Sequence, residues 1–208
     1  GWDDIHLGTL RALARRGIQA EAVRGAVVDI GMGDTDISFS WENLFAANKA
    51  IIDADADRYF FVPDAVEVTV SGAPEMTAHA PVYPNKPERG ERLLHFTGKV
   101  LLPRAEVEKG GMLRLKDLFN IRMTGEATAE YAGDSLADAR KEKAPIIQWL
   151  PAENAAPCSL LTPEGMQDGF AEPEVLGYAG KIVQFERVGF AKIDAVENGK
   201  AVAYHTHR

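Results

Sequence analysis

The sequence predicts a mainly β protein that begins with an N-terminal α-helical domain and continues into two small β-barrels. Apolar residues recur at helical spacing over the first 60 or so residues. Beyond them the segments are short, rich in β-branched and aromatic residues, and separated by turn residues. About 145 residues follow, more than one barrel of about five or six strands requires. We therefore expect a helical domain at 1–61 and two barrels at 62–208, with the chain crossing from one barrel to the other and back.

Three helices are expected in the first domain, each marked by a capping residue, an apolar stripe or a terminal glycine. Asp3 or Asp4 can cap the first helix, and Ser40 can cap the third. The first two helices are expected to end at Gly17 and Gly31. The three faces consist of Leu7, Leu10 and Leu13, of Val23, Val27 and Ile30, and of Leu44, Asn48, Ile51 and Ile52.

The expected strands are short. Residues 65–70 alternate between apolar and polar side chains, and turn signals such as Ser71-Gly72 and Asn198-Gly199 separate such segments. Residues 132–143 are charged and are expected to form a short linker or a turn of helix. Further strands are expected at 93–96, 99–102, 112–115, 127–131, 146–150, 159–161, 181–185, 189–194 and 200–205.

Composition excludes several classes of protein. Hydrophobic residues make up 46% of the 208 residues, so a core can form and the chain is not a disordered tail. No stretch approaches the ~20 apolar residues of a membrane helix. Cys158 is the only cysteine, which excludes an intramolecular disulfide and argues against a thiolate zinc site. We expect Cys158 to be a small buried hydrophobe, and the protein to be cytoplasmic.

The first residues lack the features of a secretory signal, and Gly1 stands where an initiator methionine would be. We therefore expect this chain to be part of a longer protein.

The net charge of −8 argues against a nucleic-acid partner, but its distribution is uneven. Residues 85–122 carry a local net charge of +4, whereas residues 1–61 carry −4. A basic region of this kind can bind phosphates, and it can also be an ordinary solvated surface of mixed charge.

The sequence offers no set of catalytic residues. It contains no Gly-rich phosphate loop, no nucleophile elbow and no His-Glu-x-x-His motif. Asp53, Asp55 and Asp57 alternate as in a calcium loop, but Arg58 stands where that loop needs glycine, so they are interpreted as the polar end of the third helix. The last two histidines are expected to lie in a solvated tail. We assign no catalytic residue, cofactor or metal ligand to this chain.

Two segments can recognise a nucleic acid. Residues 84–92 form a proline-braced loop with three bases, and its last base enters a strand, which would hold a guanidinium for bidentate hydrogen bonds. Residues 184–187 offer an amide, a carboxylate and a guanidinium, the groups that read unstacked bases. An edge strand with an ordinary ion pair would explain the second segment equally. Trp149 is interpreted as a core residue rather than a stacking platform.

Five short motifs follow one another along the chain. They are Gly1-Trp2-Asp3-Asp4, Tyr83-Pro84-Asn85-Lys86-Pro87-Glu88, Ile147-Gln148-Trp149, Gly169-Phe170-Ala171-Glu172-Pro173 and Val183-Gln184-Phe185-Glu186-Arg187. In this order they make the chain resemble the C-terminal portion of class I glutamyl- and glutaminyl-tRNA synthetases. The segment Arg58-Tyr59-Phe60-Phe61-Val62-Pro63-Asp64 is similar to the archaeal glutamyl branch in particular. The short segment between Leu161 and Gly169 also favours that branch.

The resemblance implies a helical domain that connects a catalytic core to proximal and distal anticodon-binding barrels. Lys116-Asp117 departs from the more basic pattern of the family. Arg114 is matched only loosely. The tRNA contacts that the resemblance implies fall on Arg92, Gln184, Glu186 and Arg187, with Lys86, Arg89, Lys116 and Arg122 as further contacts.

The resemblance also implies an activity. The full-length enzyme would be a glutamate–tRNA ligase that uses ATP and Mg²⁺, both bound by a catalytic domain that this chain lacks. Its partners would be tRNA(Glu), tRNA(Gln) and a tRNA-dependent amidotransferase, with neither DNA nor a membrane. This chain alone is expected to bind tRNA and to catalyse nothing. The alternatives are the C-terminal region of a glutaminyl-tRNA synthetase and a free-standing RNA-binding barrel protein.

Overall fold

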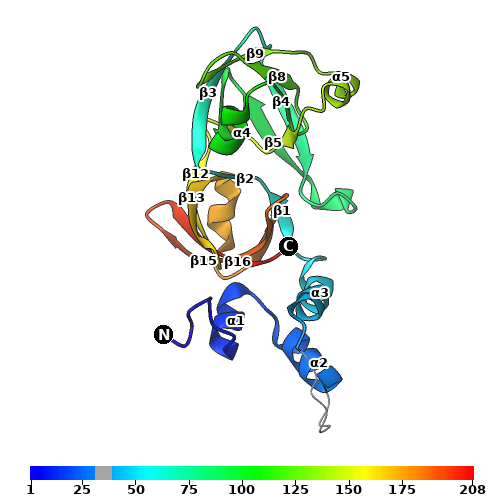
Figure 1. Ribbon diagram of the computed structural model, residues 1–208, viewed down its shortest axis with the longest axis vertical. Coiled ribbons are helices and arrows are strands. Elements are labelled where there is room, and N and C mark those ends of the chain that lie inside the picture. The colour runs from blue at the N-terminus through cyan, green and yellow to red at the C-terminus, as the bar shows by residue number, and fades with distance from the viewer. Residues whose placement is uncertain (31–38) are drawn as a thin grey trace.

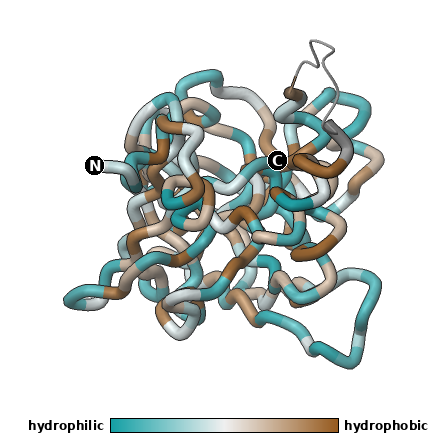
Figure 2. Tube along the Cα trace, turned by 90° about the horizontal axis from the view of Figure 1, so that it is seen from below, coloured by the Kyte–Doolittle hydropathy of each residue, from teal (hydrophilic) through white to brown (hydrophobic). Residues whose placement is uncertain are grey.

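The computed structural model describes residues 1–30 and 39–208. Two curled β-sheets are stacked along the long axis of the molecule, and the N-terminal helices lie below the lower sheet (Figure 1). Seen from below, hydrophobic and hydrophilic residues alternate in short steps along the trace, as expected for strands with one buried face (Figure 2). The expected fold class, mainly β with an N-terminal helical segment and two barrel-like sheets, is confirmed.

The helices are α1 (Leu10–Arg16), α2 (Ala20–Ile30) and α3 (Trp41–Ile52). Helix α1 is capped by Thr9, whose Oγ1 accepts a hydrogen bond from the N–H of Ala12 at 3.1 Å. The expected cap at Asp3 or Asp4 is therefore wrong, because the helix starts later and Leu7 precedes it. The expected end at Gly17 is confirmed, with a left-handed φ of 92°. Gly31, where the second helix was expected to end, lies outside the described residues.

Helix α3 begins as expected. The Ser40 hydroxyl accepts a hydrogen bond from the N–H of Asn43 at 3.2 Å. On the expected face, Leu44, Asn48 and Ile52 are buried, but Ile51 is 37% exposed. The helix ends at Ile52 with Asp53 as its C-cap, so the first of the alternating aspartates lies at its polar end, as expected. The prediction is wrong for the last of them, because Asp57 opens a strand.

The lower sheet has seven strands in the order β1-β14-β15-β16-β12-β13-β2. Its core includes the buried Cys158, as expected, and burial raises the pKa of that thiol to about 12. Its strands are β1 (Asp57–Tyr59), β2 (Phe61–Pro63), β12 (Ala156–Thr162), β13 (Gly165–Ala171), β14 (Ile182–Phe185), β15 (Gly189–Glu197) and β16 (Lys200–His207).

The upper sheet has the order β10-β7-β8-β9-β3-β6-β11, and a separate hairpin of β4 and β5 packs with it. Its strands are β3 (Ala65–Ser71), β6 (Lys99–Pro103), β7 (Met112–Leu115), β8 (Asn120–Met123), β9 (Thr128–Tyr131), β10 (Ile146–Ile147) and β11 (Leu150–Pro151), and the hairpin is β4 (Met76–Pro81) and β5 (Glu91–Phe96). Short helices are α4 (Arg104–Lys109), α5 (Leu136–Lys141), η1 (Pro87–Arg89) and η2 (Pro173–Tyr178).

Several elements differ from the expectation. The strand expected at 146–150 is divided, because Ile146–Ile147 pairs in parallel with β7 whereas Leu150–Pro151 pairs antiparallel with β6. The solvated tail expected at the last two histidines is wrong. Strand β16 reaches His207, which is 2% exposed and pairs with Phe190 of β15. The charged segment 132–143 contains α5.

Gly169 in β13 allows a close approach of two backbones. It pairs with Pro63 of β2, and an added Cβ would overlap the Val62 carbonyl and approach Pro63 Cα to 2.9 Å. Because the obstacle is backbone, we expect Gly169→Ala to lower the free energy of unfolding by about 1–3 kcal/mol, measured in urea. Gly177→Ala is the control, since nothing lies within 4 Å of its Cβ position. Equal stability of the two variants would contradict this packing.

Candidate nucleic-acid interface

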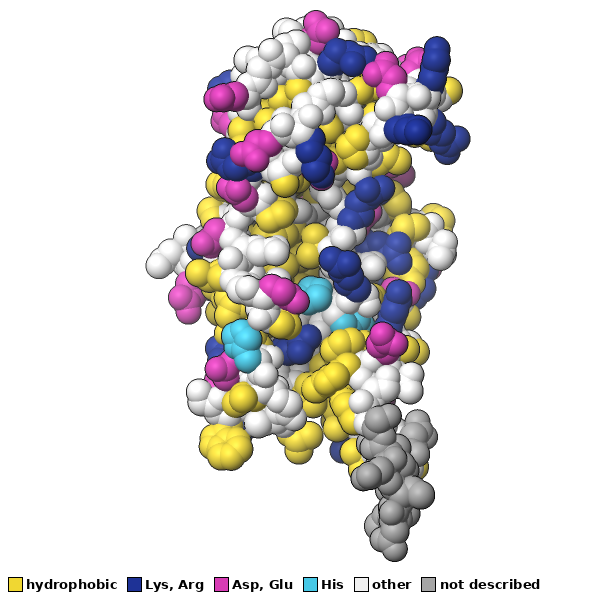
Figure 3. Space-filling view, viewed as in Figure 1, with side chains coloured by type: hydrophobic (Ala, Val, Ile, Leu, Met, Phe, Trp, Pro, Cys, Tyr) yellow, Lys and Arg dark blue, Asp and Glu magenta, His cyan; other side chains and the backbone are white. Residues whose placement is uncertain are grey.

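Basic side chains gather on one side of the molecule. Figure 3 shows Lys and Arg groups along that side, from the region of α5 in the upper sheet down past the boundary between the two sheets. The net charge of the chain is nevertheless negative, at −8. A polyanion would therefore be attracted to this side rather than to the molecule as a whole.

Strand β14 and the turn after it carry three of the expected site residues. Val183 and Phe185 point into the core of the lower sheet, so the alternating residues Gln184 and Glu186 point away from that core. Arg187 occupies the turn with a φ of 62°. Its side chain is exposed and donates a hydrogen bond to the carbonyl of Ile146 in the upper sheet. The hairpin thus presents an amide, a carboxylate and a guanidinium at the boundary between the sheets.

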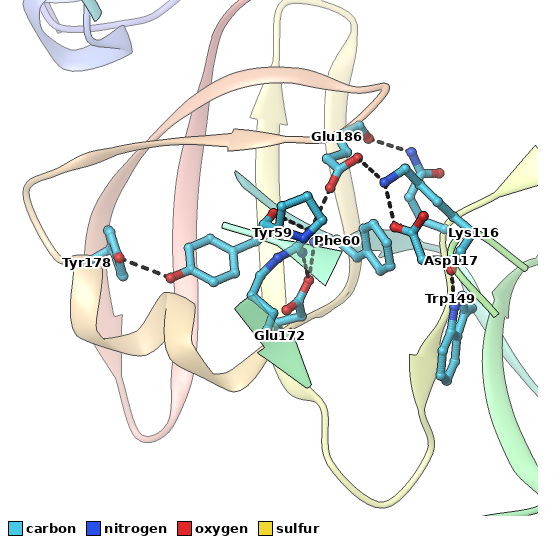
Figure 4. A network of polar contacts seen from close by, with 11 residues as sticks. Tyr59, Phe60, Lys116, Asp117, Trp149, Glu172, Tyr178 and Glu186 are labelled. Carbon is cyan, nitrogen blue, oxygen red and sulfur yellow. Dashed lines mark hydrogen bonds and ion pairs between the residues drawn. The ribbon is translucent and has the colours of Figure 1, made fainter. Parts of the chain in front are cut away.

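Arg92 of β5 is buried at the same boundary, with 3% of its side chain exposed. Its guanidinium donates to Glu172 and, at 2.7 Å, to Glu186 Oε1 (Figure 4). The same group lies 4.8 Å from the centre of the Phe60 ring. Arg92 therefore connects the β4–β5 hairpin to two carboxylates of the lower half of the molecule.

Lys116 binds the other oxygen of Glu186. Its Nζ lies 2.9 Å from Glu186 Oε2 and 2.8 Å from Asp117 Oδ2. Trp149 is fully buried and donates its Nε1–H to the carbonyl of Lys116 at 3.0 Å, so it is a core residue, as interpreted. Glu186 is thus held by two cations from the other half of the molecule. We refer to Arg92, Lys116, Glu172 and Glu186 as the junction cluster.

Polar atoms beside the junction cluster have no protein partner. Among the described residues, the buried atoms without one include Gln184 Oε1, Arg92 Nε and Arg58 Nε. Arg58 of β1 pairs in parallel register with Gln184 of β14. Unpaired buried polar groups are costly to stability, so they mark a place where an added ligand could complete the hydrogen bonds. An acceptor and N–H donors are the groups that read the edge of a base.

Lys86 and Arg89 bind backbone carbonyls that follow helix α3, not the junction cluster. Lys86 Nζ and Arg89 donate to the carbonyl of Ala54 at 2.9 and 2.8 Å, and Arg89 also donates to Asp55. Cations are favourable at these carbonyls because they follow the C-terminal end of α3. The structure therefore joins the 84–92 loop to the helical segment through these two residues.

Arg122 lies in the upper sheet, and its hydrogen-bond partner is not a member of the junction cluster. It donates two hydrogen bonds of 2.8 Å to the carboxylate of Glu142, beyond α5. The loosely matched Arg114 of β7 donates to the Asp134 carbonyl at 2.8 Å. Within the described residues, neither side chain forms a hydrogen bond or ion pair with Arg92 or Glu186.

The sequence did not reveal Glu172 or Arg58 as members of this region. Glu172 is 3% exposed and accepts the N–H of Phe60 at 2.6 Å in addition to Arg92. The sequence did contain a signal for the burial of Glu172, because it is a single acid between apolar residues and Pro173. An acid in such a place is buried only with a partner. The partner, 80 residues away along the chain, could not be identified.

Glu172 should make stability depend on pH. Burial raises its pKa to about 7, although Arg92 and the Phe60 N–H act in the opposite direction. The folded pKa lies above the unfolded value of about 4.3, so this contribution to stability is present below the unfolded pKa and is lost as pH rises through 7. We expect Glu172→Gln to abolish that loss. Urea unfolding at pH 5 and pH 8 tests this, and an unchanged difference between the two pH values would contradict it.

Two family models match the chain. Both are described as the anti-codon binding domain of class I tRNA synthetases (E and Q), and they cover residues 56–136 and 146–194, together more than half of the chain. The chain belongs to this family. Every member of the junction cluster falls within the matched ranges, so the anticodon-binding domain family includes the region that joins the two sheets.

Curated relatives are similar to this chain over its whole length. It is 79% identical to a glutamate–tRNA ligase of Methanocorpusculum labreanum, 58% identical to one of Methanoculleus marisnigri and 43% identical to one of Methanocaldococcus jannaschii. The chain spans 37 to 38% of the length of these relatives. In the described part of this family member, no helix combines the length and apolar character required to cross a membrane.

Proposed function

We propose that this chain recognises the anticodon of tRNA(Glu) as part of a glutamate–tRNA ligase. The observation that carries the proposal is the group of unpaired polar atoms at the junction cluster, two of which belong to Arg92 and Gln184, where the resemblance places anticodon contacts. Family membership and the names of the archaeal relatives support the same ligase.

In this proposal the contacts divide into two classes. Gln184, Glu186 and Arg187 read base edges, and Arg92 holds Glu186 in place between the sheets. Lys86, Arg89, Lys116 and Arg122 supply positive potential near the phosphates while they keep their present partners. Their contribution would weaken with salt, whereas the base contacts would depend on the anticodon sequence.

The remaining properties of the ligase are proposed from the resemblance and the relatives. The enzyme would act in the cytoplasm, would also charge tRNA(Gln), and would pass that product to a tRNA-dependent amidotransferase. ATP and Mg²⁺ would be bound by parts of the ligase outside these 208 residues, so no chemical step is assigned to this chain. A specificity for glutamine is the alternative. The relatives are named glutamate–tRNA ligase, which favours the glutamate specificity proposed here.

Binding of this chain to tRNA transcripts tests the proposal. We expect tRNA(Glu) to bind more tightly than the same transcript with a substituted anticodon, by about tenfold or more for each base read. Affinity for both should fall as salt is raised from 50 to 200 mM. Equal affinity for native and substituted anticodons at every salt concentration would contradict anticodon recognition by this chain.

A further inference from the structure

A concave region lies beside Arg187, outside the junction cluster. It has a volume of about 790 Å³ and lies where α1, α3, the β12–β13 turn and the C-terminal strand β16 meet. Figure 3 shows histidine side chains on this face, between the Lys and Arg groups and the helical segment. We call this region the histidine pocket, and its lining includes Arg16, Phe45, Glu164, Arg187, His205 and His207.

The charge of the histidine pocket suits an anion. Arg16, Arg187 and Arg208 line it, while Glu164 is the one acidic side chain among its described lining residues. Burial lowers the pKa of His205 and of His207, so the positive charge of the pocket comes from the arginines. Arg16 is 8% exposed and donates to the carbonyls of His205 and Thr206 at 3.2 and 2.8 Å. These hydrogen bonds hold the guanidinium before any ligand arrives, which lowers the entropy cost of binding.

The pocket also contains a flat aromatic surface. The Phe45 and His207 rings are stacked with centroids 5.3 Å apart, and the Arg16 guanidinium lies 5.6 Å from the Phe45 centroid. His207 Nε2 lies 3.0 Å from the amide nitrogen of Asn48, and its Nδ1 lies 3.0 Å from the Arg208 carbonyl. An Nδ1–H tautomer would satisfy both contacts, so the ring is fixed in orientation. Phe45 remains partly exposed, which leaves area for a further ring.

We propose that the histidine pocket binds one unstacked nucleotide of the tRNA, next to the base that Arg187 reads, with its base against Phe45 and its phosphate among the cations. Aromatic rings beside arginines are the arrangement that holds unstacked nucleotides of single-stranded RNA. This inference rests on the proposed function and extends it. Arg16, Phe45 and both pocket histidines lie outside the residues that the family models match.

The first test removes the aromatic surface. Phe45→Leu keeps an apolar side chain on α3, and we expect it to weaken binding of tRNA(Glu) by at least about fivefold, because base stacking is lost. Phe39→Leu is the control, since Phe39 is 43% exposed and is not among the residues that line the pocket. Thermal unfolding of each variant checks that the fold is retained.

The second test changes charge without touching the core. Glu164→Gln is expected to tighten binding of tRNA(Glu) by about two- to threefold, because it removes the carboxylate nearest to the bound phosphate. Glu197→Gln changes the net charge equally at the exposed end of the β15–β16 hairpin, and we expect it to leave the affinity unchanged. Glu164 is exposed, so this test remains decisive if Phe45→Leu is destabilised.

A scan of abasic nucleotides through the anticodon loop identifies the occupant. We expect one position outside the anticodon triplet at which base removal weakens binding to the wild-type chain but not to Phe45→Leu. If the wild type prefers the native anticodon while both pocket variants bind like their controls and no such position exists, the histidine pocket inference is overturned and anticodon recognition stands. If the wild type does not distinguish anticodons, both inferences fail.

Discussion

Replacing Arg92 with methionine is expected to lower the free energy of unfolding by about 3–5 kcal/mol, the range for removing one partner of a buried ion pair. The guanidinium is 3% exposed and contacts Glu172 and Glu186, which are themselves 4% and 14% exposed. Without it, two carboxylates of the lower half would lose their shared cation, leaving Lys116 with Glu186 and the Phe60 N–H with Glu172. Urea unfolding at pH 7.5 measures the loss.

Arg104→Met is the control for this result. Arg104 pairs with Asp64 at 3.1 Å, but half of its side chain is exposed, so its loss should cost at most about 1 kcal/mol. A double variant, Arg92→Met with Glu172→Gln, should recover part of the stability because one uncompensated carboxylate is removed. The Arg92→Met loss should also be smaller at pH 5.5, where Glu172 takes up a proton. A loss no greater than that of Arg104→Met would show that the junction cluster does not hold the sheets together.

Local sequence signals predicted where the helices and strands of this fold lie better than they predicted which elements pack or pair with one another. Ser40 and Gly17 mark the ends of helices through their own backbone geometry, and strand 112–115 was predicted at its observed bounds. Asp4 and Thr9 are both good caps, and the choice between them depends on packing against the rest of the molecule. Strand β1 is only three residues long and exists because β14 lies beside it, with paired residues 126 positions apart in sequence.

In the candidate site, too, local neighbours could be predicted from the sequence and distant contacts could not. Gln184, Glu186 and Arg187 are neighbours on one hairpin, so their shared position followed from strand alternation. That Lys86 and Arg89 bind carbonyls after α3 was not visible, because it depends on a contact across more than 30 residues. The burial of the last histidines was missed for a similar reason: sequence position at a terminus says little about pairing in a sheet.

Replacement of Gln184 and Arg187 should separate recognition from stability. We expect Gln184→Ala and Arg187→Gly each to reduce discrimination between native and substituted anticodons by about 1–3 kcal/mol, with the larger share lost in the double variant. Competition binding of the two transcripts measures this ratio directly. Arg104→Ala is the matched control, because it removes an exposed arginine whose partner is Asp64.

Stability should change little or rise in the same two variants. Gln184 Oε1 is buried without a partner, so removing it relieves an unpaired acceptor. Arg187 has a φ of 62°, a left-handed conformation that glycine adopts at lower cost, which offsets the hydrogen bond lost to Ile146. A residue that holds the fold loses stability when it is replaced, as Arg92 is expected to. If Gln184→Ala and Arg187→Gly unfold more easily and still distinguish anticodons, these residues support the hairpin, and base recognition must be sought elsewhere on this face.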